Sequence, residues 1–155
     1  MIFWIASYPK NGNTWLRTLL CAYYFTKDGF FSDDALLKNI GQFPEKKYFD
    51  QFEYKINTPG DTSRLWIKAQ ENINRDKKIR FFKTHNFLGG LGGNEFTDLR
   101  NTIGAVYIVR DPRNVITSLK NHFELSYDEA LKFMQNEKKF TYDYFKGEDY
   151  SDFQF

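Results

Sequence analysis

The chain has 155 residues, of which 41% are hydrophobic and 27% are charged, a composition that is typical of one soluble domain. Its formal net charge of +2 is too small to predict nucleic-acid binding, and no apolar stretch approaches the roughly 20 residues that span a bilayer. The single cysteine, Cys21, excludes an intramolecular disulfide and a multi-cysteine zinc site, and its apolar surroundings predict a buried, unreactive thiol. We expect one cytoplasmic domain over residues 1–155, with no nucleic-acid or membrane partner.

The N-terminal third predicts a strand, a polar turn and a helix. Residues 2–6 form a continuous apolar run, as in a parallel strand covered on both faces. The polar turn follows, and residues 14–24 place apolar side chains at helical spacing. Cap residues at 32–34 predict a short helix to Asn39, whereas residues 41–59 are expected to be irregular and to contact substrate or solvent.

The rest of the chain alternates helical and strand patterns. We predict a helix over 61–75, a strand over 79–84, a flexible glycine loop at 89–93 and a strand over 103–109. A helix starting at Pro112 follows, and a capping box at Ser126 opens another to about residue 139.

Strands separated by helices predict parallel pairing through right-handed crossovers, and hence a three-layer α/β/α domain. Ligands of such sheets gather at the carboxyl ends of the strands. The polar sequences at 7–14, 83–86 and 110–118 each follow a predicted strand, so we expect them to meet at one edge.

The first of these sequences has the features of an anion site. The first turn of a helix has backbone N–H groups without intrahelical partners and carries the positive end of the helix dipole. Gly12 lets the backbone approach a ligand closely, and Lys10 adds a full positive charge.

Three motifs together closely resemble the family of sulfotransferases that depend on 3′-phosphoadenosine 5′-phosphosulfate (PAPS). They are Y-P-K-N-G-N-T-W at residues 8–15, K-T-H at 83–85 and Y-I-V-R-D-P-R-N-V-I-T-S at 107–118. The resemblance extends to about His122. It implies a central parallel sheet similar to that of P-loop nucleoside triphosphatases and transfer of a sulfuryl group to an acceptor hydroxyl or amine, which releases 3′-phosphoadenosine 5′-phosphate (PAP).

The resemblance assigns roles to the first motif. The matching lysine, Lys10, contacts the leaving oxygen, while Thr14 and the loop amides at Asn11, Gly12 and Asn13 bind the 5′-phosphate. Asn11 and Asn13 depart from the Y-P-K-S-G-T-T-W pattern of cytosolic animal members, but asparagine keeps donor capacity. The alternative for Lys10 is a surface lysine in an ordinary strand-to-helix turn.

The other motifs supply the remaining site residues. Trp15 matches a tryptophan near the adenine, with a core residue as the alternative. Lys83 matches a lysine that stabilises the sulfuryl oxygens, and His85 matches the general base. Arg110 and Ser118 match the 3′-phosphate site. The alternatives are a salt bridge of Arg110 with Asp111 or with an acidic residue elsewhere, and an ordinary helix serine at 118. The scheme needs no metal, and His122, which lies outside the motifs, is expected to be structural or on the surface.

Two other functions compete with this one. A nucleotide-triphosphate kinase would need a G-x-x-x-x-G-K-[ST] motif, which is absent, and Asp111 is the only candidate magnesium ligand. A catalytically incomplete PAPS- or PAP-binding fragment is the other, because the family's C-terminal glycine-rich motif has no match after His122. The aromatic tail at 143–155 is expected to need a partner chain or an oligomer to cover it.

Overall fold

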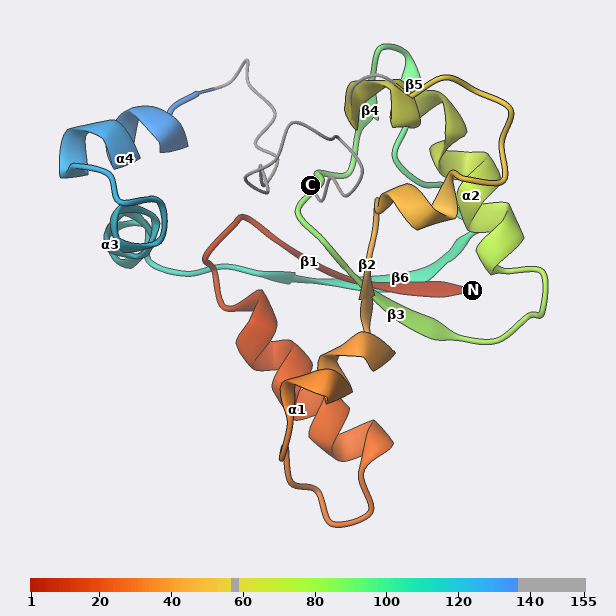
Figure 1. The fold of residues 1–155 in the computed structure, drawn as a ribbon, viewed down its shortest axis with the longest axis horizontal. Helices are drawn as coiled ribbons and strands as arrows, with labels where there is room; N and C mark the ends of the chain where they lie inside the picture. The colour runs from red at the N-terminus through yellow and green to blue at the C-terminus, as the bar shows by residue number, and fades with distance from the viewer. Residues whose placement is uncertain (57–58, 137–155) are drawn as a thin grey trace.

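Four parallel strands form the central sheet, in the order β2-β3-β1-β6 (Figure 1). The computed structural model describes residues 1–56 and 59–136. The strands are β1 (Ile2–Ser7), β2 (Gly41–Gln42), β3 (Arg80–Thr84) and β6 (Thr102–Ile108). The central strand, β1, pairs with β3 on one side and β6 on the other, so its apolar run is covered from both edges as well as both faces.

Helices cover both faces of this sheet, which confirms the predicted three-layer architecture. Helix α1 (Asn13–Phe25) and the 3-10 helix η1 (Asp34–Asn39) lie on one face, and α2 (Trp66–Ile73) lies on the other (Figure 1). The 3-10 helices η2 (Lys46–Tyr48) and η3 (Pro59–Leu65) precede α2. No helix within the described part of the chain combines the length and apolar character needed to cross a bilayer.

The remaining two helices lie beyond one end of the sheet rather than on a face. Helices α3 (Pro112–Phe123) and α4 (Tyr127–Met134) follow β6 on the side toward which β1 and β6 run (Figure 1). Val115, Leu119 and Ala130 are buried between them, and Tyr8, from the turn after β1, packs against this cluster. Tyr8 therefore fixes the helix pair next to the first turn, and its burial raises the pKa of the phenol.

The two faces of the sheet bury separate apolar clusters because side chains alternate along each strand. Trp4 and Phe82 face α2, whereas Ile5 and Phe81 face α1. On the α2 face, the ring of Phe43 lies 5.8 Å from that of Trp4, measured between centroids.

Replacing Phe43 with alanine is expected to lower the free energy of unfolding by about 3–5 kcal/mol, since the side chain is fully buried and leaves a cavity. Urea denaturation measures the change. Phe30, which is 72% exposed, is the matched control, and Phe30→Ala is expected to stay within about 0.5 kcal/mol of the unsubstituted chain. Equal losses in the two variants would contradict this placement of the core.

The structure differs from the predicted elements in four places. The segment expected to be irregular contains β2, which adds a fourth strand to the sheet. The glycine loop forms a hairpin of β4 (Gly90–Leu91) and β5 (Asn94–Glu95), because Gly92 and Gly93 both take the positive φ that a tight two-residue turn requires. The predicted helix over 61–75 begins as the 3-10 helix η3, and α4 ends at Met134.

Two other predictions are confirmed, and a third concerns residues that the structure does not describe. The capping box at Ser126 is present, with its hydroxyl accepting from the N–H of Glu129. Cys21 is fully buried, and burial raises the pKa of its thiol, as expected for an unreactive cysteine. The aromatic tail at 143–155 lies outside the described residues.

Candidate active site

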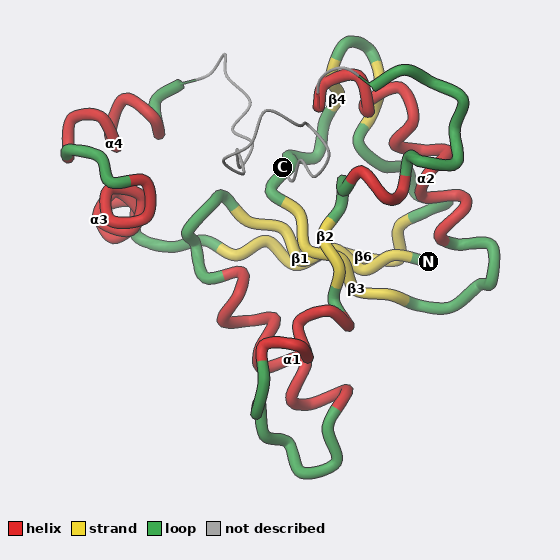
Figure 2. Tube along the Cα trace, viewed as in Figure 1, coloured by secondary structure: helices red, strands yellow, loops and turns green. Residues whose placement is uncertain are grey.

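The three polar sequences meet at the carboxyl ends of β1, β3 and β6, as predicted. Figure 2 shows the loops that leave these strands on the side of α3. A cavity of about 360 Å³ lies among them. It is lined by Pro9, Lys10, Gly12, Asn13, Thr14, Lys83, His85, Arg110, His122 and Phe123.

A tight turn presents Lys10 and the start of α1 to this cavity. The N–H of Asn11 donates to the carbonyl of Tyr8 at 3.2 Å, and both Lys10 (φ 65°) and Gly12 (φ 98°) have left-handed backbone. No side chain caps α1, whose first turn contains no acidic residue. Its leading N–H groups and the helix dipole are therefore placed to attract an anion.

The side chains of Asn11 and Asn13 tie this turn to the sheet. Both are buried, with exposed fractions of 9% and 4%. The amide of Asn11 donates to the carbonyl of Ile108 at 3.2 Å, and that of Asn13 donates to the carbonyl of Ile5 at 2.9 Å and to the hydroxyl of Ser7 at 3.1 Å. Because these side-chain donors are directed at the protein, a phosphate role for this turn depends on main-chain N–H groups.

His85 lies against the end of β1. Its Nδ1 is 2.7 Å from the carbonyl oxygen of Ser7 and 3.3 Å from the Ser7 hydroxyl. A carbonyl oxygen can only accept, so in the neutral ring Nδ1 carries the hydrogen and Nε2 has the basic lone pair. The sequence motif did not reveal this role of Ser7.

Lys83 is held in place by the short strand β2. Its Nζ donates to Oε1 of Gln42 at 2.7 Å, and Gln42 is 6% exposed. This contact arises because β2 pairs in parallel with β3 and places Gln42 level with Lys83. A two-residue strand has too little periodicity to be found in the sequence, so Gln42 was missed.

Arg110 bonds to the first turn rather than to Asp111. Its Nη1 donates to the carbonyl of Lys10 at 3.3 Å. Asp111 instead accepts from the guanidinium of Arg113 at 2.6 Å and from the Arg113 N–H at the start of α3. The Arg113 contact lowers the pKa of the Asp111 carboxyl. The alternative of a salt bridge between Arg110 and Asp111 is therefore wrong.

The other two predicted residues, Trp15 and Ser118, differ in how exposed they are. Trp15 lies in the first turn of α1 and is 69% exposed, so the alternative of a core residue is wrong. Ser118 is half-buried on α3 and is not among the residues that line the cavity. The structure thus brings Arg110, but not Ser118, into this cavity.

His122 and Phe123 were not predicted to lie at the site. They come from the last turn of α3, with their rings 4.7 Å apart in an edge-on arrangement. They reach the cavity because α3 packs against Tyr8, and such long-range packing leaves no motif in the sequence.

The charges that line the cavity have one sign. Lys10, Lys83 and Arg110 contribute permanent positive charge, and the lining residues, all in the described part of the chain, include no carboxylate. Within residues 1–56 and 59–136, no three His, Cys, Asp or Glu side chains gather where a metal ion could be held. The arrangement suits a ligand with several negative charges.

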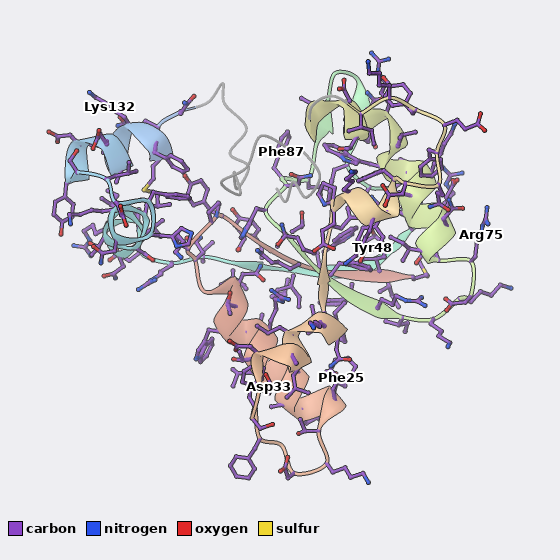
Figure 3. All side chains as sticks on the ribbon, in the orientation of Figure 1. Phe25, Asp33, Tyr48, Arg75, Phe87 and Lys132 are labelled. Atoms are coloured by element: carbon purple, nitrogen blue, oxygen red, sulfur yellow. The ribbon has the colours of Figure 1, made fainter. Side chains whose placement is uncertain are left out.

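A larger cavity of about 1280 Å³ adjoins His85 on the α2 face. Thr84 and Asn86, the two neighbours of His85 in the chain, both line it. Phe87 projects on the α2 side of the sheet (Figure 3). The large apolar side chains in its wall are those of Trp4, Ile67, Phe87, Leu88, Phe96, Leu99 and Tyr107.

Comparison with known proteins adds one finding. A family model described as "Sulfotransferase domain" matches residues 2–152. No curated protein and no solved structure matches the chain.

Proposed function

The chain belongs to the sulfotransferase domain family, and from this premise we propose that it transfers the sulfuryl group of PAPS to an acceptor hydroxyl or amine. The observation that supports PAPS as donor is the cavity itself. It joins the uncapped start of α1 to Lys10, Lys83 and Arg110. These groups suit the phosphate and sulfuryl oxygens of such a donor, and none of them requires a metal ion.

Each side chain has a defined part in the proposed reaction. The acceptor oxygen or nitrogen attacks sulfur as the bond between sulfur and the 5′-phosphate oxygen breaks, and that oxygen keeps the electron pair. Lys10 stabilises the charge that develops on this oxygen, while Lys83 stabilises the sulfuryl oxygens. Nε2 of His85 takes the proton from the acceptor. Thr14 and the N–H groups of the first turn of α1 hold the 5′-phosphate.

The nucleoside part of PAPS is assigned to the exposed side of the turn between β1 and α1. The exposed indole of Trp15 offers a face on which adenine can stack. Arg110 provides a charged, multidentate donor for the 3′-phosphate, with Ser118 as its proposed helper from α3. The acceptor is proposed to enter from the larger cavity, since Thr84 and Asn86, the two neighbours of His85 in the chain, line it.

Replacing Arg110 with alanine is expected to weaken PAP binding by about 10- to 150-fold. A hydrogen bond to a charged group contributes about 1.5–3 kcal/mol, which corresponds to that change in Kd. Isothermal titration calorimetry measures the affinity for PAP and, separately, for ATP, which lacks the 3′-phosphate. The unsubstituted chain is expected to bind ATP much more weakly than PAP.

The matched control is Arg75→Ala. Arg75 is exposed and lies far from the turn that follows β1 (Figure 3), so PAP affinity should stay the same. Equal affinities for PAP and ATP in the unsubstituted chain would refute the assignment of PAPS. PAP binding without any sulfuryl transfer would favour the catalytically incomplete fragment.

The kinase alternative loses support from the structure. Asp111, its only candidate magnesium ligand in the sequence, caps α3 and pairs with Arg113. A cytoplasmic location, a single domain and a partner that covers the aromatic tail remain predictions from the sequence.

A further inference from the structure

Ser7 is the point at which the anion-binding turn meets the proposed base. It is the last residue of β1 and is only 1% exposed. Its hydroxyl accepts from the Asn13 amide at 3.1 Å and lies 3.3 Å from Nδ1 of His85, while its carbonyl lies 2.7 Å from the same nitrogen. Water does not compete for these bonds at a buried position, so they can hold geometry firmly.

Asn13 anchors the other end of this connection. Its amide also donates to the Ile5 carbonyl at 2.9 Å, and the residue is the first of α1. The helix start, the end of β1 and the histidine that follows β3 are thereby joined through Ser7. The pairing of β1 with β3 brings His85 to this point, since Ala6 is opposite Thr84 in the parallel register.

We propose that Ser7 is a positioning residue, which holds His85 in the Nδ1–H tautomer and aims Nε2 at the acceptor. The effect of Ser7 on catalysis rests on the proposed function, whereas the tautomer of His85 does not depend on it. Both oxygens of Ser7 face Nδ1, and an Nδ1–H donor satisfies them, whereas a lone pair on Nδ1 would repel the carbonyl oxygen. The same contacts stabilise the imidazolium that forms when Nε2 takes a proton.

The tautomer can be read directly by NMR. His85 and His122 are the only histidines, so a long-range ¹H–¹⁵N spectrum of the full chain holds just two imidazole patterns. At a pH where His85 is neutral, the unsubstituted chain is expected to show His85 as the Nδ1–H form. His122→Gln identifies which pattern belongs to which ring.

Ser7→Ala keeps the main-chain carbonyl nearest Nδ1, so the Nδ1–H form should persist, whereas loss of the hydroxyl contact is expected to lower kcat about five- to tenfold, the loss typical of one hydrogen bond. PAP affinity is expected to change less than twofold, because the cationic residues remain. Ser7→Thr keeps the hydroxyl and should retain the original kcat. Thr62→Val is the matched control, since Thr62 is also buried, its hydroxyl also accepts a side-chain hydrogen bond, and it lines neither of the two cavities.

The outcomes separate clearly. An Nε2–H form of His85 in the unsubstituted chain would overturn the proposal, as would a Ser7→Ala variant with unchanged kcat. An equal loss of kcat in Thr62→Val would reduce the effect to general destabilisation and overturn it as well. If the unsubstituted chain transfers no sulfuryl group, the proposed function fails, while the spectrum still decides how Ser7 positions His85.

Discussion

Replacing Lys10 with alanine is expected to lower kcat for sulfuryl transfer by about 10²- to 10³-fold, the usual loss when a preorganised donor to a developing negative charge is removed. Contacts within the protein hold the turn that contains Lys10. Asn11 and Asn13 bond it to β6 and β1, and Arg110 donates to the Lys10 carbonyl. Transfer of labelled sulfate from PAPS to a panel of hydroxyl acceptors measures the loss.

Lys77 provides a matched control. It also has left-handed backbone, with φ 59° against 65° for Lys10, so alanine is subject to the same conformational penalty at both positions. Lys77 is exposed and precedes β3, at the opposite end of the strand from Lys83. Lys77→Ala should keep the original rate, and a Lys10→Ala variant that also keeps it would rule out a role for Lys10 at the breaking bond.

His85→Asn is expected to lower kcat by about 10²- to 10⁴-fold, the range that general base catalysis contributes. The asparagine amide can still donate toward the Ser7 carbonyl, so the local fold is retained while the basic Nε2 is lost. PAP affinity should change little, since His85 is proposed to take a proton from the acceptor substrate rather than to bind the nucleotide. The same labelled-sulfate assay and calorimetry report the two quantities.

Chemical rescue distinguishes a missing base from a damaged site. His85→Gly leaves space beside Ser7, and added imidazole is expected to restore part of its rate. A His85→Asn variant with the original rate would disprove the assignment of the base. Loss of PAP binding together with rate would instead indicate that His85 supports the nucleotide site.

Local sequence patterns predicted much of the fold. The apolar runs at 2–6 and 103–109 correspond to β1 and β6 within a residue or two, and β1 is apolar from Ile2 to Ala6 because it is a central strand with both faces covered. Cys21 and the Ser126 capping box were also correct. In contrast, β2 is only two residues long and forms by pairing with the edge of β3. The sequence pattern predicts a flexible loop for the glycine segment, although two adjacent glycines favour the tight turn of a hairpin.

The sequence by itself determined that three polar segments follow strands, and parallel pairing then requires them to meet. Lys10, Lys83, His85 and Arg110 lie in these segments, the family resemblance assigned their roles, and one cavity contains them. Only the tertiary structure showed that the side chains of Asn11 and Asn13 point into the protein, that Ser7 holds His85, and that His122 reaches the site while Ser118 does not line it. Side-chain direction and helix docking depend on contacts between residues up to 100 positions apart, such as Arg110 with Lys10, and no local pattern records them.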